Sequence, residues 1–200
     1  MKVQWLNKVS GAAAILLAVL SIICLASGAV YAANMVGLID DLLGSVENFL
    51  EIFYVAAPVL LLVVWVGLYF VHRRQNKIMS LVALIIGVAS TILCLIDVHF
   101  VTVWTTGGQF PAVEVGSIYA IGIRLPFFVL LIFGILGQKA EGMSLKYSFL
   151  TILLALGFAF SNLTNYWNDL AFLEACLFLL LAAWGLWLGI LLWKGKLELK

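Results

Sequence analysis

Residues 115–137 read Val-Gly-Ser-Ile-Tyr-Ala-Ile-Gly-Ile-Arg-Leu-Pro-Phe-Phe-Val-Leu-Leu-Ile-Phe-Gly-Ile-Leu-Gly, and they decide the class of fold. The 23 residues are enough to cross a bilayer as one helix, and Arg124 is their only charged residue. An arginine within the hydrocarbon costs several kcal/mol unless it pairs or reaches the headgroups, so it marks a candidate functional site. At about 1.5 Å per residue, this arginine is expected roughly 12–14 Å below the outer end of its span.

The composition of the whole chain agrees with a membrane protein. Of its 200 residues, 65% are hydrophobic and only 10% are charged, whereas about a quarter of the residues of a soluble domain are charged. The net charge of +1 gives no basic excess that would indicate nucleic acid as a partner. The three cysteines lie within apolar runs and show no disulfide or metal-ligand spacing. The sequence therefore predicts neither a metal site nor a cofactor.

Six apolar runs are long enough to span a membrane, and the connections between them are too short to form a separate soluble domain. The sequence predicts an all-α integral membrane protein, a bundle of six transmembrane helices in one polytopic domain covering residues 1–200. The predicted spans are residues 11–33, 52–71, 78–96, 115–137, 147–167 and 170–193.

The distribution of lysine and arginine predicts the orientation of the bundle. Basic residues precede the first run, follow the sixth, and lie between the second and third and between the fourth and fifth. With six spans, all of these positions fall on one side of the membrane, and a lysine and arginine excess indicates the cytoplasmic side. We therefore expect both termini in the cytoplasm and the protein in a plasma (inner) membrane.

Two segments before the second span allow further interpretations. Residues 1–32 also fit a secretory signal with cleavage after Ala32, which would leave five spans and an outer amino terminus. Residues 35–51 alternate apolar and acidic positions at helical spacing, which predicts an amphipathic helix on the outer surface that runs into the second span.

Small residues at four-residue spacing predict where helices approach one another closely. The patterns are Ala14-x-x-x-Ala18 in the first span, Ala83-x-x-x-Gly87-x-x-x-Thr91 in the third, and Gly185-x-x-x-Gly189 in the sixth. In lipid, helices associate through such small residues because apolar bulk alone gives no preference for protein over lipid. These faces fit packing inside the bundle, and they also fit self-association or docking onto other membrane subunits.

Polar side chains gather at the outer ends of the third to sixth spans. Arg124 is expected to pair with Glu174 first and with Asp97 second, since a long arginine side chain can bridge the difference in depth. The pair would either fix helix register or form part of a site that binds a carboxylate or phosphate bidentately. The candidate ligand-binding residues are Asp97, His99, Trp104, Arg124, Asn162, Asn165, Trp167 and Glu174.

Catalytic chemistry has less support in the sequence. Asp97 and His99 would point to one face only if their segment is extended, as the alternating pattern of the loop 97–114 suggests. The other histidine, His72, is expected on the opposite side of the membrane, so a two-histidine metal site is excluded. No nucleophile, zinc or phosphate-loop motif occurs. These observations favour a non-enzymatic role.

Three functions remain open. Residues 34–97 loosely resemble the pilin subunits of conjugative secretion systems, and the six-span outline is similar to the substrate-binding components of vitamin transporters. Neither resemblance extends over enough of the chain to assign a family. The apolar middles of four spans favour a non-catalytic membrane-embedded subunit of a larger membrane complex. The alternatives are a small-solute binding or transport protein with an outward-facing site, and an intramembrane enzyme with an outer-face Asp/His site. A subunit should leave the Gly185/Gly189 face open for a partner helix.

Overall fold

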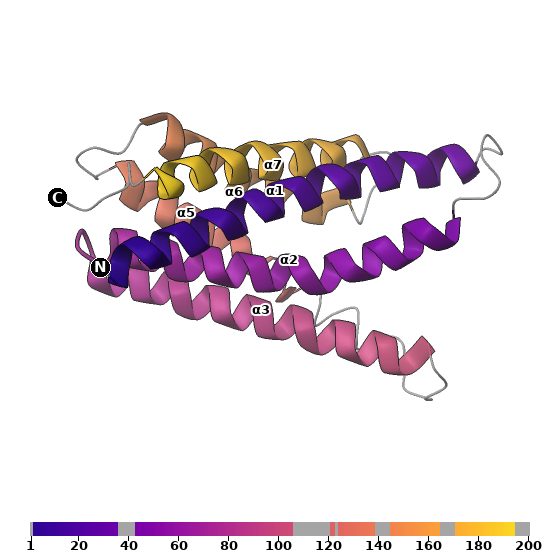
Figure 1. Ribbon diagram of the computed structural model, residues 1–200, viewed down its shortest axis with the longest axis horizontal. Helices are drawn as coiled ribbons and strands as arrows, with labels where there is room; N and C mark the ends of the chain where they lie inside the picture. The colour runs from indigo at the N-terminus through magenta and orange to yellow at the C-terminus, as the bar shows by residue number, and fades with distance from the viewer. Residues whose placement is uncertain are drawn as a thin grey trace.

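The computed structural model describes the backbone of residues 2–35, 43–105, 121–122, 124–138, 145–164 and 171–194. It describes the side chains of residues 4–27, 55–96, 121–122, 124–138, 145–159 and 176–194. These parts of the chain contain helices and turns and no strand (Figure 1). The helices are α1 (Lys2–Met35), α2 (Leu43–His72), α3 (Lys77–Thr105), α5 (Leu125–Gln138), α6 (Leu145–Thr164) and α7 (Ala171–Trp193).

The six helices form a closed ring. Each helix packs against the next one along the chain, and α7 returns to pack against α1, while α2 and α5 also touch each other across the ring. The amino terminus, the end of α7 and the short turn between α2 and α3 lie at the same end of the bundle (Figure 1). We call this the basic end, because it carries Lys8, Arg73, Arg74, Lys77, Lys146 and Lys194.

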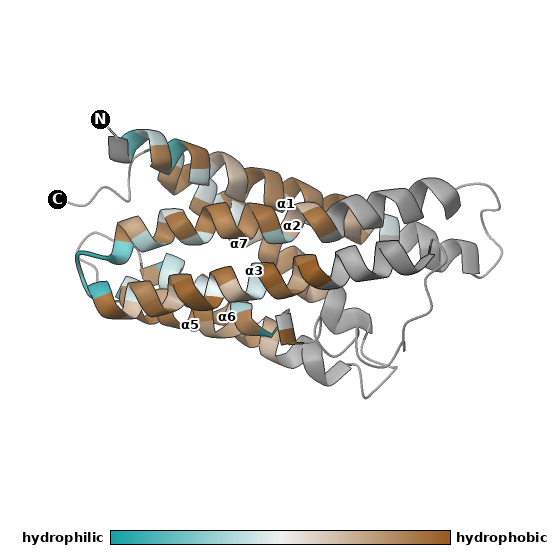
Figure 2. Cartoon of the chain, turned by 90° about the horizontal axis from the view of Figure 1, so that it is seen from below, coloured by the Kyte–Doolittle hydropathy of each residue, from teal (hydrophilic) through white to brown (hydrophobic). Residues whose placement is uncertain are grey.

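Among the described residues, four helices are long and apolar enough to cross a membrane, through the segments Gln4–Ser27, Val55–His72, Lys77–Ile96 and Cys176–Trp193. Two shorter apolar helices, Leu125–Gln138 and Leu145–Ala159, complete the ring. Figure 2 shows hydrophobic residues along the described helices and hydrophilic residues gathered at the basic end. Large apolar side chains are exposed on the outer faces, as expected where lipid rather than water is the solvent. Examples are Trp5, Leu16, Val55, Ile78, Phe128, Leu145, Phe149 and Trp193.

The small-residue patterns lie where helices meet most closely. A Cβ added to Gly185 would lie 2.7 Å from the carbonyl oxygen of Ala14 and 3.2 Å from Cβ of Ala18. A Cβ added to Gly189 would lie 2.8 Å from the carbonyl oxygen of Gly11. The face of α7 that should have stayed open for a partner helix is therefore covered by α1, and that prediction is wrong. The backbones of α1 and α7 meet directly because α7 carries glycine at these positions, and the side chain of Ile15 on α1 also packs against Gly189.

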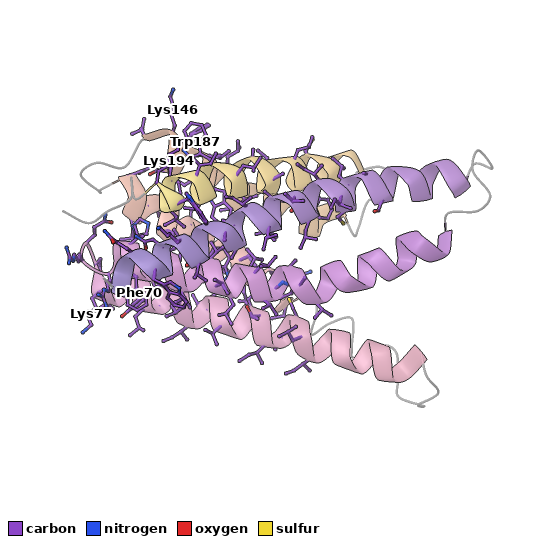
Figure 3. The ribbon with its side chains drawn as sticks, viewed as in Figure 1. Phe70, Lys77, Lys146, Trp187 and Lys194 are labelled. Carbon is purple, nitrogen blue, oxygen red and sulfur yellow. The ribbon has the colours of Figure 1, made fainter. Side chains whose placement is uncertain are left out.

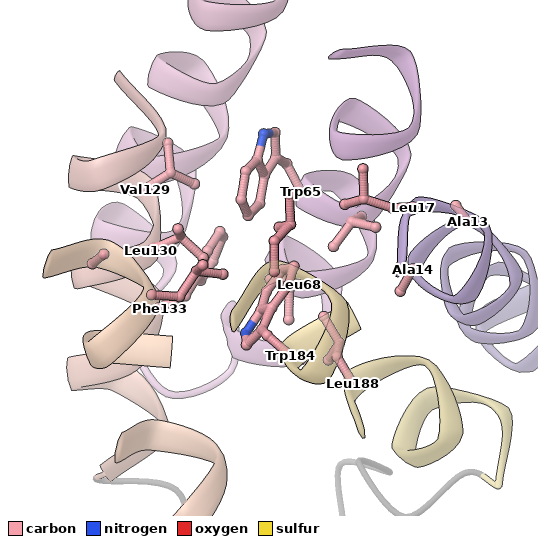
Figure 4. Packing of buried hydrophobic residues seen from close by; sticks show 14 of the residues in the cluster. Ala13, Ala14, Leu17, Trp65, Leu68, Val129, Leu130, Phe133, Trp184 and Leu188 are labelled. Atoms are coloured by element: carbon pink, nitrogen blue, oxygen red, sulfur yellow. The ribbon is translucent and has the colours of Figure 1, made fainter. Parts of the chain in front are cut away.

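Aromatic side chains fill the middle of the ring in its basic half (Figure 4). The rings of Trp65 from α2 and Phe133 from α5 stack with centroids 6.4 Å apart. Trp184 from α7 lies 6.1 Å from Trp65, and its indole nitrogen donates a hydrogen bond of 3.0 Å to the hydroxyl of Thr151 on α6. These contacts join α2, α5, α6 and α7, so side chains from four of the six described helices pack together in the centre of the ring.

The prediction that the helix 35–51 runs into the second span is confirmed for residues 43–51, since α2 runs without interruption from Leu43 to His72. Met35 is the last residue of α1, and residues 36–42 lie outside the described part of the chain. Another local prediction needs revision. Residues 97–105 were expected to be extended, but they are the last turns of α3. Hydrophobic alternation alone misled here, because a short stretch of β-branched and aromatic residues fits a strand and a membrane helix equally well.

Candidate functional site

The fourth apolar run does not form one uninterrupted helix. Residues 121–122 are helical, Arg124 lies in a turn, and α5 begins immediately afterwards at Leu125. The turn is marked by hydrogen bonds over three residues: the backbone N–H of Arg124 donates to the carbonyl of Ile121, and that of Phe127 donates to the carbonyl of Arg124. Pro126 lies in the first turn of α5, where its missing N–H costs no helical hydrogen bond.

The turn lies about half-way along the neighbouring helix α3. The hydroxyl of Ser90 donates a buried hydrogen bond of 2.8 Å to the carbonyl oxygen of Gly122. Ser90 is 13 residues beyond the first residue of α3, Lys77, which corresponds to about 20 Å from the basic end of a helix of about 43 Å. Counting the 14 residues of α5 gives a similar depth of about 21 Å. The prediction of a single helical span through Arg124 is wrong, because the turn at Arg124 interrupts the helix. The outer end of the run lies outside the described residues, so the expected depth below that end stays a prediction.

The backbone of this turn approaches α3 closely. A Cβ added to Gly122 would lie 2.9 Å from the sulfur of Cys94 and 3.1 Å from the backbone nitrogen of Cys94. Only glycine fits this contact, so position 122 holds the interrupted helix against α3. One residue beyond Ser90, the hydroxyl of Thr91 is shared between the carbonyl oxygens of Gly87, at 3.1 Å, and of Pro58 on α2, at 3.3 Å.

The side chain of Arg124, the residue directly before the start of α5, is exposed. A guanidinium is permanently charged and presents five donors in a fixed plane, which suits a carboxylate or a phosphate. The side chains of its predicted partners, Glu174 and Asp97, lie outside the described residues, so the pairing stays a prediction.

The other predicted site residues are described only in part. Asp97, His99 and Trp104 lie in the last turns of α3, and positions two apart in a helix are separated by about 200° around its axis. The helical backbone therefore removes the geometric basis for a joint Asp97/His99 site. Asn162 lies near the end of α6 and Glu174 in the first turn of α7. Asn165 and Trp167 lie outside the described residues.

Buried polar groups in the basic half were not singled out from the sequence. Within the described side chains, the atoms without a hydrogen-bond partner include the hydroxyls of Tyr147 and Ser148 and the amide oxygen of Asn7. At His72, Nδ1 is hydrogen-bonded to the side-chain oxygen of Gln75 at 3.0 Å, while Nε2 has no partner. The ring of His72 stacks on Phe133 with centroids 5.4 Å apart. Only the long apolar runs around these residues, which imply burial, could have indicated them.

The described residues contain no group of three or more His, Cys, Asp or Glu side chains that could hold a metal ion. The three cysteines are free thiols, two of them buried. No family model, curated protein or solved structure matches this chain.

Proposed function

We propose that the chain crosses a plasma (inner) membrane six times, with both termini in the cytoplasm. Apart from Arg124, the described lysines and arginines gather at one end of the ring, which supports this orientation because positive loops stay on the cytoplasmic side. A cysteine introduced at Asn76, in the turn between α2 and α3, should resist a membrane-impermeant maleimide in intact cells. A cysteine at Gln109 should react. Labelling of the first but not the second would reverse the orientation.

We further propose that the protein binds or transports a small anionic solute at an outward-facing site around Arg124. The observation that supports it most is the interruption of the fourth span at Arg124. With the basic end at one boundary of a hydrocarbon layer of about 30 Å, the turn would lie about 10 Å below the opposite boundary. Interrupted helices at such depths are typical of solute and ion sites in transporters.

The exposure of Arg124 adds to this proposal. A charged side chain at this depth is costly against lipid, so it is expected to face a polar or water-filled space within the protein. The hydroxyl of Ser90 and the carbonyl of Gly122 lie on the α3 side of the same turn. A ligand carboxylate or phosphate that accepts two hydrogen bonds from the guanidinium is the solute chemistry that fits.

The test is ligand-dependent thermal stability of the purified protein in detergent or nanodiscs. A panel of carboxylates and phosphates should contain a compound that raises the Tm, since a ligand at about 100 times its Kd stabilises by about 2.7 kcal/mol. Arg124→Gln should abolish the shift, whereas Arg73→Gln at the basic end should retain it. If every active compound also acts on Arg124→Gln, the site is elsewhere. If none acts on the wild-type protein, the solute proposal fails.

A non-catalytic subunit of a larger membrane complex is the second candidate. The aromatic layer of Trp65, Phe133 and Trp184 supports it, because a filled core in the basic half is what a structural bundle needs. The closed contact between α1 and α7 speaks against it, since the glycine face is already used. Purification in mild detergent followed by mass spectrometry separates the two candidates: a stoichiometric partner protein would favour the subunit. The intramembrane enzyme has lost its main support with the helical geometry at Asp97 and His99.

A further inference from the structure

Polar side chains without hydrogen-bond partners lie on the basic side of the aromatic layer. His72 is the last residue of α2, and Tyr147 and Ser148 lie in the first turn of α6. Figure 3 labels Lys77 and Lys146, which lie close to them in the sequence, at the basic end. Nε2 of His72 and the hydroxyls of Tyr147 and Ser148 are buried and have no partner among the described side chains. Such groups cost stability, so they call for another role.

The polar contacts near Arg124 lie on the other side of the layer. α3 begins at the basic end, and its residue Gly87 touches the layer, because a Cβ added there would lie 3.2 Å from Nε1 of Trp65. Ser90 follows Gly87 by three residues, farther from the basic end, and its hydroxyl bonds to the turn that carries Arg124. The aromatic layer therefore separates the polar groups at the turn from those of the basic half.

Trp65 lies where two parts of the ring meet. Because α2 and α5 touch across the ring, α3 lies on one side of this contact, and α1, α6 and α7 lie on the other. The indole of Trp65 touches Gly87 of α3, stacks on Phe133 of α5 and lies 6.1 Å from Trp184 of α7 (Figure 4). One side chain thus contacts both parts.

The two tryptophans of the layer are held differently. The indole nitrogen of Trp184 donates to the hydroxyl of Thr151, whereas that of Trp65 has no partner among the described residues. Rotation of Trp65 out of the layer breaks no hydrogen bond and allows its N–H to find an acceptor. Gly87 presents no side chain against the indole. Of the two tryptophans, Trp65 therefore loses less free energy on leaving the layer.

We infer that the solute proposed at Arg124 crosses the protein through the middle of the ring, and that Trp65 is the gate of this path, closed in this structure. The inference rests on the proposed solute site and adds a route through the membrane to it. When the indole leaves the layer, the unpaired polar groups of the basic half meet the solute and its water. A purely structural core would be more stable with apolar side chains in place of these unpaired groups.

Access to position 148 from the outer side tests the gate. Intact cells that express the Ser148→Cys protein receive sulfonatoethyl methanethiosulfonate, an anionic reagent that does not cross membranes, and mass spectrometry quantifies the modified peptide. Trp65→Ala removes the gate, and Gly87→Ala displaces it, because the new Cβ would lie 2.6 Å from Cδ1 of Trp65. Each change, added to Ser148→Cys, should raise the rate of modification about tenfold, since the rate follows the population of the open path.

Gly157→Ala is the matched control, because its Cβ would meet only the side-chain ends of Leu177 and Leu180; it should change the rate less than about twofold. Equal rises in Gly157→Ala and the gate variants would overturn the inference, since any disturbed packing would then admit the reagent. No rise in the gate variants, with the ligand-dependent Tm shift retained, would overturn the path and leave the solute site intact. Absence of that shift in the wild-type protein would end both proposals. Should Trp65→Ala fail to fold, Gly87→Ala decides the question.

Discussion

The contact between α1 and α7 and the contact between α3 and α5 both bring two helices within reach of each other's backbone, but they are held differently. In the first, uninterrupted helices meet over two turns, and the carbonyls of Gly11 and Ala14 face glycines of α7. In the second, a helix has already ended, and a side-chain hydroxyl of α3 binds the carbonyl of Gly122. The first contact needs only the absence of side chains, whereas the second needs a hydrogen bond.

The difference has a physical cause. Within a helix, every carbonyl before the last turn is already bonded, so helices that meet through glycine and alanine gain mainly van der Waals contact from a close approach. At a helix break, carbonyls lose their partners, and in lipid each one must find another. Ser90 supplies that partner at Gly122. We conclude that close backbone packing holds α1 against α7. The turn at Arg124, by contrast, exposes backbone groups that can form polar interactions.

The largest expected effect comes from filling the α1/α7 contact. Gly185→Leu should prevent folding or destabilise the protein by about 3 kcal/mol or more, because its Cβ alone would meet the carbonyl of Ala14. Ala183→Leu, on the exposed face of the same helix, is the matched control and should leave the Tm nearly unchanged. Size-exclusion profiles and thermal unfolding in detergent measure both. A tolerated Gly185→Leu would mean that α1 does not cover α7, as expected if residues 1–32 are cleaved.

The next effect tests the charge at the helix break. Arg124→Leu should destabilise the protein by about 3–5 kcal/mol if an acidic side chain is left unpaired in the membrane. Adding Glu174→Leu should recover much of the loss, and adding Asp97→Leu should recover it less. Chemical denaturation or thermal unfolding of the single and double variants gives the coupling energy. Strictly additive losses for both pairs would show that neither acid is the partner.

A smaller effect isolates the hydrogen bond that holds the break. Ser90→Ala should cost about 1 kcal/mol, the usual contribution of an interhelical hydrogen bond in a membrane protein. Ser21→Ala is the control, because the hydroxyl of Ser21 bonds only to the carbonyl of Leu17 one turn earlier in its own helix. Ser90→Ala should also change the Kd of a solute bound near Arg124. If Ser90→Ala and Ser21→Ala lower the free energy of unfolding equally, the hydrogen bond to Gly122 does not hold the turn against α3.

The last effect is of similar size and has the opposite sign. The hydroxyl of Tyr147 is buried without a partner among the described side chains, so Tyr147→Phe should raise the free energy of unfolding by about 1 kcal/mol. Thr151→Val is the contrasting variant, since its hydroxyl accepts from Trp184 and donates to the carbonyl of Tyr147; it should lower stability. If Tyr147→Phe instead destabilises, an internal water molecule bonded to the phenol is the explanation, and the basic half of the ring is hydrated.

Much of the architecture follows from local sequence features. Long apolar runs require helices in lipid, because only a helix satisfies the backbone of a single segment there. Lysine and arginine in alternate connections gather at one end of any up-and-down bundle. The small-residue patterns at Ala14/Ala18 and Gly185/Gly189 marked close contacts correctly, since a missing side chain permits an approach whatever the partner is.

What the sequence could not supply was the choice of partner and the place where a helix ends. The pattern Gly185-x-x-x-Gly189 does not show whether α1 or a helix of a second protein packs there, because any helix can approach a face without side chains. The closed ring of the fold selects α1. The run 115–137 is apolar enough for one helix, but Pro126 has no N–H for the carbonyl of Gly122 four residues earlier, and the hydroxyl of Ser90 on α3 donates to that carbonyl instead. The sequence determined that an arginine lies deep in the fourth apolar run. The tertiary structure decided that it stands at a helix break, because only a neighbouring helix can satisfy the backbone that the break exposes.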